Sequence, residues 1–190
     1  MAGTLIDIYD QLLSEYGPQG WWPAESRFEI VVGALLTQNT NWRNVESAIG
    51  NLKAAGMCEA AKMLSCGKAE LETMIRPSGF YRQKAERLRV LTEKYIEIER
   101  RGYPPTRDEL LDLKGVGKET ADSILLYAYG LPFFVIDAYT RRFCEHHKFM
   151  RAEEYDEYRS FFERSLPKDV LLYKEYHALI VEWGKRMKKK

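Results

Sequence analysis

The chain has 190 residues, of which 45% are hydrophobic and 30% are charged, and its net charge is +1. This composition is typical of an ordinary folded protein with one large domain or two small lobes. The near-zero charge argues against a strongly basic coating protein, because any polyanion would have to be bound by local patches.

The first residues, "MAGTLIDIYDQLLSEYG", mix acidic and apolar side chains and lack the basic start of a secretory signal. The longest nearly apolar run, 124–136, contains a Gly-Leu-Pro break and is too short to cross a bilayer. The three cysteines, Cys58, Cys66 and Cys144, form no CxxC pair and suggest reduced thiols. We therefore expect a cytoplasmic protein without a membrane partner.

Apolar residues at helical spacing run through the first half of the chain. Ser26 and Glu29 predict a capping box, followed by one apolar helix face: Phe28, Val31, Val32, Leu35 and Leu36. The next predicted helix presents Val45, Ala48, Ile49 and Leu52. A longer helix is expected from about 81 to 101. The residues expected to face the core are Ala85, Leu88, Thr92, Tyr95 and Ile96.

The second half of the chain has the same periodicity. Thr106 and Glu109 predict a second capping box at the start of a short helix. Another apolar face follows, made of Ala121, Ile124, Leu125 and Ala128. The tail from Pro167 predicts a last helix with Leu172, Tyr176, Leu179, Ile180, Trp183 and Met187. About ten helices and no convincing strand pair predict an all-α fold.

The stretch "LKGVGKETA" places Gly115 and Gly117 between two short helices. Glycine accepts positive φ and carries no side chain, so backbone N–H groups beside a helix N-terminus can face a phosphate. Lys114 and Lys118 flank the pair with positive charge. The plainer alternative, a helix-ending glycine followed by a tight turn, explains the same residues equally well.

Residues around this hairpin resemble those of the helix-hairpin-helix DNA glycosylases of the endonuclease III superfamily. The resemblance rests on "LKGVGKETA", on Asp137 in "VIDAYTRR" twenty residues after Gly117, and on the upstream segments "ALLTQNTNWRNVESAIGNL" and "SGFYRQKAERL". It covers nearly the whole chain and implies a two-lobed all-α fold. Residues 24–130 would form the lobe with the hairpin, residues 1–23 and 131–190 the other, with the pocket and Asp137 between them.

The resemblance implies that Asp137 is catalytic. It would stabilise the positive charge that develops on the sugar and orient or deprotonate water. Capping the helix that starts at Ala138 is the ordinary alternative and does not exclude catalysis. The family's Schiff-base lysine is replaced here by Glu119, and Lys118 would lie about 100° away around the helix. A water nucleophile without lyase activity is therefore expected.

Two further features concern the cofactor and the base. No cysteine follows Cys144, so the family's four-cysteine iron–sulfur loop is not expected and no cofactor is predicted. "GWWPAES" and the aromatic after "LTQNTN" resemble the 3-methyladenine branch, where such aromatics sandwich the extruded base. That assigns Trp21, Trp22, Pro23 and Trp42 to a base pocket, although tryptophans also serve simple packing. An alkylated cationic purine gains about 0.5–2 kcal/mol on an indole face.

By the same resemblance, Gln38 is expected to fill the gap left in the duplex, and Phe80 to wedge against the opposite strand. Lys185 matches a lysine that lies near the pocket in the alkyladenine branch and can be carbamylated there. Glu119 is a candidate second pocket carboxylate. Each has a plainer alternative. Gln38 would be an ordinary turn residue and Phe80 an ordinary apolar contact. Lys185 would be a solvated lysine and Glu119 an exposed first-turn glutamate.

Together these features predict a monomeric, monofunctional glycosylase that removes alkylated bases, above all 3-methyladenine, from double-stranded DNA in the nucleoid. An endonuclease III-like enzyme acting on another damaged or mismatched base, with some lyase activity, is the alternative enzyme. A DNA-binding module that kept the hairpin and lost the chemistry is the alternative from another class.

Overall fold

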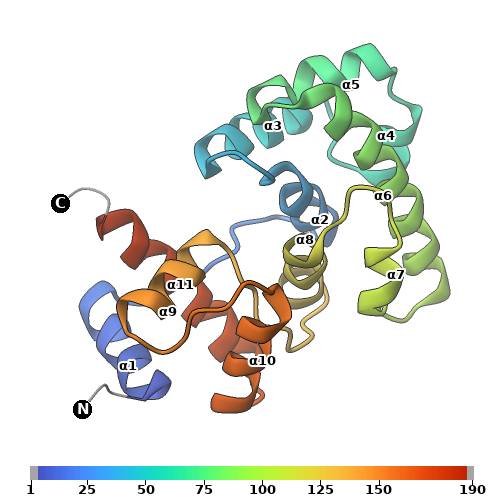
Figure 1. Ribbon diagram of the computed structural model, residues 1–190. Coiled ribbons are helices and arrows are strands. Elements are labelled where there is room, and N and C mark those ends of the chain that lie inside the picture. The colour runs from blue at the N-terminus through green and yellow to red at the C-terminus, as the bar shows by residue number, and fades with distance from the viewer. Residues whose placement is uncertain (1–3, 188–190) are drawn as a thin grey trace. The chain divides into compact units, whose positions relative to one another are not determined.

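The computed structural model describes residues 4–187, and no strand occurs in that range (Figure 1). The prediction of an all-α fold is confirmed. The chain divides into two compact units, one made of residues 4–23 and 130–187 and the other of residues 24–129.

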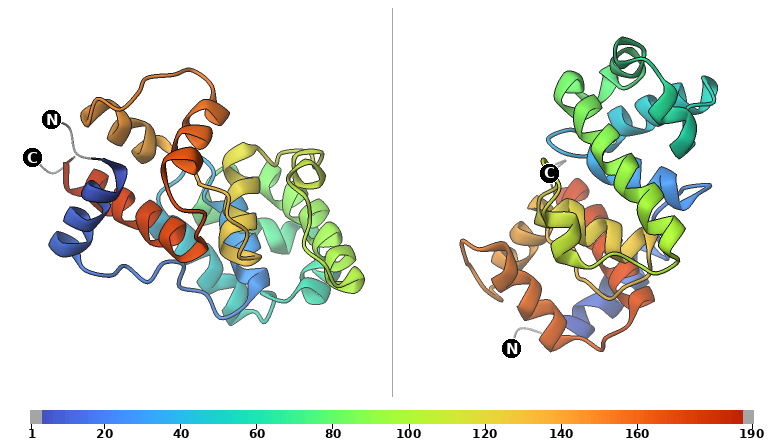
Figure 2. Two further views of the ribbon diagram at one scale, coloured as in Figure 1. Left: turned by 90° about the horizontal axis from the view of Figure 1, so that it is seen from below. Right: turned by 90° about the vertical axis from the view of Figure 1, so that its right-hand side faces the viewer.

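The first unit combines the two ends of the described chain. It contains α1 (Leu5–Tyr16), α9 (Ala138–His146), α10 (Tyr155–Ser165) and α11 (Val170–Met187). Helices α1 and α11 lie side by side (Figure 2), and the buried Tyr176 hydroxyl donates a hydrogen bond of 2.8 Å to the carbonyl of Leu5. Aromatic rings fill the core: Phe134 stacks on Phe162 with centroids 4.1 Å apart and meets Tyr176 edge-on.

The second unit consists of helices from consecutive sequence. They are α2 (Arg27–Leu36), α3 (Trp42–Ala54), α4 (Ala60–Ser65), α5 (Lys68–Met74), the 3-10 turn η1 (Arg76–Ser78), α6 (Tyr81–Arg101), α7 (Arg107–Leu111), α8 (Lys118–Ser123) and the π-helical segment η2 (Ile124–Ala128). Helix α2 is almost wholly buried, because its residues pack against α3, α6, α8 and η2. A helix apolar on all sides is expected at such a centre.

Most predicted core positions are buried, with a few differences. The Ser26 side chain caps α2 by accepting from the Glu29 amide, but the Glu29 carboxylate accepts from the Glu25 amide and the expected reciprocal bond is missing. In α6, Ile98 is buried while Ile96 is half-buried. At the end of α11, Met187 is 43% exposed, because this last turn extends beyond the packed part of the helix.

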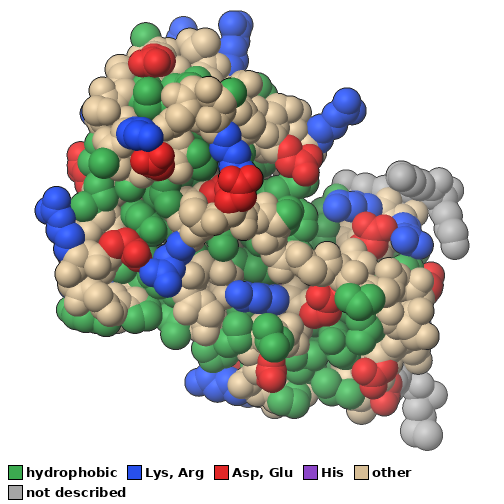
Figure 3. Space-filling model, turned by 180° about the vertical axis from the view of Figure 1, so that it is seen from behind, with side chains coloured by type: hydrophobic (Ala, Val, Ile, Leu, Met, Phe, Trp, Pro, Cys, Tyr) green, Lys and Arg blue, Asp and Glu red, His purple; other side chains and the backbone are tan. Residues whose placement is uncertain are grey.

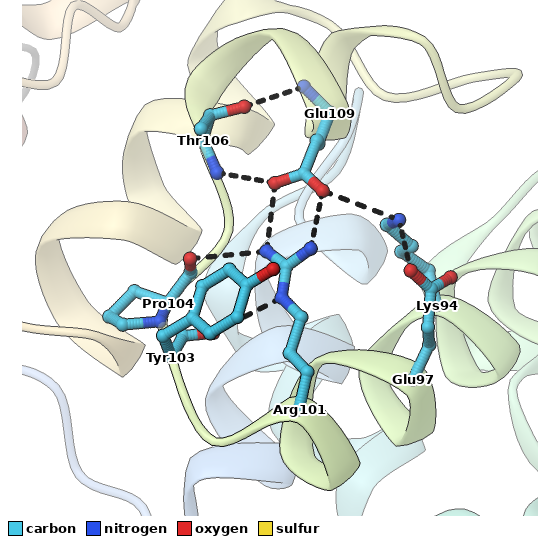
Figure 4. Close-up of polar contacts among 7 residues, drawn as sticks. All are labelled: Lys94, Glu97, Arg101, Tyr103, Pro104, Thr106 and Glu109. Atoms are coloured by element: carbon cyan, nitrogen blue, oxygen red, sulfur yellow. Dashed lines mark hydrogen bonds and ion pairs between the residues drawn. The ribbon is translucent and has the colours of Figure 1, made fainter.

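The connection between α6 and α7 is clamped by Arg101 (Figure 4). Its guanidinium donates to both carboxylate oxygens of Glu109 and to the carbonyls of Tyr103 and Pro104. Glu109 also closes the predicted capping box with Thr106, which is confirmed. Because α7 is the first helix of the hairpin, this clamp sets where the hairpin begins.

A buried ion pair joins the two hairpin helices. The Arg107 side chain donates to Asp122 through Nε and Nη2, at 2.6 and 3.1 Å, and the Asp122 side chain is fully buried. A two-bond guanidinium–carboxylate pair restrains angle as well as distance. The mutual orientation of α7 and α8 is thereby restrained.

Candidate functional site

The hairpin between α7 and α8 turns at Gly115. This residue has a φ of +88°, in the region that favours glycine, and the Val116 amide donates to the carbonyl of Leu113 at 3.0 Å. Gly117 differs, since its φ of −92° is extended and it forms the N-cap of α8. The positive φ considered for both glycines is therefore found only at Gly115.

The two glycines also differ in their surroundings. A Cβ atom on Gly115 would lie 2.2 Å from Nε of Arg87, so the protein itself requires glycine there. A Cβ on Gly117 would meet no atom within 4 Å. Gly117 supplies no side-chain cap to the first turn of α8, a position where serine, threonine or aspartate is usual. Neither strain nor crowding explains this glycine, whereas close approach of an outside group would.

We expect Gly117→Val to weaken binding to every duplex by a similar factor, because a phosphate contact carries no base information. Gly67→Val is a matched control, since Gly67 is also an extended N-cap glycine of a short helix, and a Cβ there would meet only Cβ of Glu70, at an ordinary contact distance of 4.0 Å. Fluorescence anisotropy with damaged and undamaged duplexes measures the effect. A loss confined to one lesion, or an equal loss in the control, would contradict the phosphate role.

Gln38 lies against the hairpin. Its Nε2 donates to the carbonyl of Gly115 and to Oγ1 of Thr120, both at 2.9 Å, and its Oε1 accepts from Nη1 of Arg87 at 3.0 Å. The structure therefore brings together two residues predicted separately, Gln38 and Gly115. Insertion of Gln38 into a duplex would break all three hydrogen bonds, so gap filling stays a prediction.

Phe80 has two features typical of a functional position. Its side chain is 66% exposed, and its φ of +47° is unusual for a bulky residue. The buried Lys84 stabilises the loop that carries Phe80. Its Nζ donates to the carbonyls of Ser78 and Leu36 at 2.7 and 2.8 Å. Burial lowers the pKa of Lys84 to about 8, with a smaller contribution from Arg87. An exposed aromatic on a braced loop suits contact with another molecule.

Asp137 is the N-cap of α9, and its carboxylate oxygens have different surroundings. Oδ1 accepts from the Thr140 amide at 2.7 Å and from the Thr140 hydroxyl at 3.0 Å. Oδ2 lies 3.5 Å from Nε2 of His177. Burial raises the pKa of Asp137, but the interactions with His177 and Thr140 together outweigh it and hold this pKa below its usual value. The group is therefore a carboxylate at neutral pH.

The remaining predicted residues are distributed over both units. The first unit contains Trp21, Trp22 and Pro23. The two indole rings are tilted against each other, with centroids 5.5 Å apart. Lys185 is exposed in the last turn of α11. In the second unit, the half-buried Trp42 begins α3, and the exposed Glu119 lies in the first turn of α8. Lys114 is exposed and Lys118 half-exposed beside Gly117.

Several site neighbours were missed by sequence reasoning. They are the partners of predicted residues: Arg87 beside Gln38, Thr140 and His177 beside Asp137, and Lys84 beneath Phe80. Thr140 had a local signal, because Asp-x-x-Thr is a capping spacing. His177 is forty residues from Asp137 and had none.

Charges on the face drawn in Figure 3 are mixed, with lysine and arginine interspersed among aspartate and glutamate. Within residues 4–187 no cluster of three or more histidine, cysteine or acidic side chains is arranged to hold a metal ion. No helix in the same range is long and apolar enough to cross a membrane.

Comparison with known proteins identifies the class. Residues 32–168 match the HhH-GPD superfamily of base excision DNA repair proteins, and the chain belongs to this family. It is a DNA glycosylase of base excision repair.

Three individual proteins illustrate this similarity. A predicted DNA repair glycosylase of Methanocaldococcus jannaschii is 50% identical over 98% of this chain and 89% of its own length. The structure of the H. pylori 3-methyladenine DNA glycosylase bound to 1,N6-ethenoadenine superposes with a TM-score of 0.87, at 33% identity over 97% of this chain and 99% of that one. Endonuclease III of Thermotoga maritima is 30% identical over 84% of this chain and 74% of its own.

Proposed function

We propose that this protein is a monofunctional DNA glycosylase that hydrolyses the N-glycosidic bond of alkylated bases in double-stranded DNA, foremost 3-methyladenine. The observation that carries the proposal is the likeness to the H. pylori 3-methyladenine DNA glycosylase over nearly the full length of both chains. The aromatic residues Trp21, Trp22 and Trp42 add to it, because a cationic purine is attracted to electron-rich rings.

Asp137 supplies the charge that the reaction needs. Cleavage of the bond to an alkylated purine develops positive charge on the sugar, while the departing base becomes neutral. A carboxylate near the sugar stabilises that transition state and accepts a proton from the attacking water. The lowered pKa of Asp137 keeps it ionised at neutral pH, as this role requires. The base leaves easily, so a strong general acid is unnecessary and no cofactor is invoked.

The base and the DNA backbone are assigned to different residues. An extruded base is held by stacking and edge contacts, which we assign to Trp21, Trp22, Pro23 and Trp42, with Glu119 and Lys185 as polar neighbours. The hairpin binds the backbone through the open side of Gly117 and the flanking Lys114 and Lys118. Phe80 wedges the duplex, and Gln38 enters the gap after releasing its hydrogen bonds to the hairpin.

We expect no covalent enzyme–DNA intermediate, because Glu119 stands where a lyase has its imine-forming lysine. Borohydride added during turnover should trap no protein–DNA adduct on a denaturing gel, whereas endonuclease III run in parallel should give one. An adduct that maps to Lys118 or Lys185 would contradict the monofunctional assignment and favour the endonuclease III-like alternative, which the relative from T. maritima supports.

The substrate is tested by incubating the protein with duplexes that carry different lesions and measuring the free base released. The proposal expects 3-methyladenine to be released fastest, with neutral lesions of similar shape slower. Faster release of an oxidised pyrimidine or a mismatched thymine would identify the alternative enzyme. Tight DNA binding with no base released from any duplex would indicate a binding module.

A further inference from the structure

We propose that His177 is a positioning residue for the Asp137 carboxylate. It holds the oxygen that helix capping leaves available and directs it toward the reacting sugar and water. This inference rests on the catalytic role given to Asp137 under the proposed function.

The two oxygens of Asp137 are differently engaged. Oδ1 accepts two hydrogen bonds from Thr140, one from the amide and one from the hydroxyl, and so serves the start of α9. Oδ2 has no part in this cap and faces Nε2 of His177 at 3.5 Å. The same carboxylate therefore caps a helix with one oxygen and presents the other for chemistry. Capping by Oδ1 therefore leaves the catalytic role of Asp137 open, as expected from the sequence.

His177 reaches Asp137 because α11 approaches α9 closely. Gly184 lies two helical turns after His177 and so on the same face of α11. A Cβ on Gly184 would lie 2.2 Å from Cδ1 of Tyr139, so only glycine permits this contact. The approach brings the N-terminal part of α9 against the face of α11 that carries His177.

His177 lies in a buried stretch of α11. It lies in the sequence "YHALIVEW", where Tyr176, Leu179 and Ile180 are fully buried and His177 is 8% exposed. Burying a polar ring among such neighbours costs free energy unless it has a polar partner. Asp137 is one such partner, and its own side chain is only 17% exposed. The interaction with Asp137 is therefore a reason for a histidine at this buried position.

A contact of 3.5 Å is long for a hydrogen bond and suits orientation more than neutralisation. A short bond from His177 would withdraw charge from the carboxylate that must stabilise the cationic sugar. At the observed distance Nε2 faces Oδ2 without a short hydrogen bond, so Oδ2 keeps its lone pairs for water. Catalytic groups need such support, because small errors in placement cost rate.

The test compares His177→Gln with His177→Asn. Both variants put an amide at this position, but the asparagine side chain is one carbon shorter and falls short of Asp137. Single-turnover base release is measured on duplex DNA methylated with dimethyl sulfate, and duplex affinity is measured separately. We expect His177→Asn to slow release about tenfold, a size typical of coupling between contacting residues. His177→Gln should keep at least about a third of the rate, and neither should change affinity more than about twofold.

The same two substitutions are then made in Asp137→Asn. If His177 acts through the carboxylate, neither has a further effect in that background, because the group it positions is gone. Equal effects of Gln and Asn, through activity or through unfolding, would contradict the inference by giving the imidazole a purely structural role. So would a tenfold loss that persists in the Asp137→Asn background.

Failure of the proposed function would look different. If no base is released by the unaltered protein, or if Asp137→Asn alone leaves the rate unchanged, the catalytic assignment fails first. If Asp137→Asn slows release while both His177 variants act at the normal rate, only the positioning role of His177 fails.

Discussion

Asp137→Asn is expected to reduce single-turnover base release about 10²–10³-fold, the cost of losing one electrostatic stabiliser of a transition state. Asparagine caps helices as well as aspartate does, so the start of α9 should persist. Its amide has no negative charge, however, and cannot stabilise the cationic sugar or accept a proton from water. Duplex affinity and the melting temperature should therefore change little.

Asp169 provides the matched control for this experiment. It is an exposed aspartate that caps the start of α11, where its Oδ1 accepts from the Leu172 amide at 2.9 Å. Asp169→Asn should leave base release unchanged, since no reacting group is assigned there. A folded Asp137→Asn protein with full activity would remove Asp137 from the mechanism. Unfolding of Asp137→Asn, with Asp169→Asn stable, would make its main role structural.

Trp42→Ala is expected to lower the affinity for lesion-bearing DNA roughly five- to 150-fold, because stacking on an aromatic contributes about 1–3 kcal/mol per base. The loss should be small on undamaged duplex, which places no base in the pocket. Trp42 begins α3 and is half-buried, so its ring is only partly used in packing. Trp42→Phe keeps a stacking surface and should recover most of the affinity.

Tyr103→Ala is the control for removing an aromatic from the same unit. This ring is 61% exposed and packs against Arg101, with no place in the proposed pocket. It should not alter the preference for damaged DNA. Equal losses for Trp42→Ala on damaged and undamaged duplexes would assign Trp42 to the fold or the DNA surface. The 3-methyladenine proposal would then lose an important support, while family membership would be unaffected.

The sequence by itself determined the helices and the family. Apolar spacing of 3.6 residues is a local property, so α6 begins and ends at the predicted residues, Tyr81 and Arg101. Capping is equally local, and Thr106 with Glu109 starts α7 as expected. The hairpin glycines, and Asp137 twenty residues on, were recognisable because their spacing along the chain is short.

Only the tertiary structure decided which residues surround the hairpin glycines and Asp137. Gly115 has a positive φ, and Arg87, from another helix, occupies the space where a Cβ would lie, whereas Gly117 faces open space. His177 reaches Asp137 where α11 packs against α9, and a glycine on α11 permits the close contact with Tyr139. Such contacts join residues far apart in the chain, and no periodicity or capping rule encodes them. They arise when whole helices pack. Asp137 could therefore be predicted from the sequence, whereas its contact with His177 is seen only in the structure.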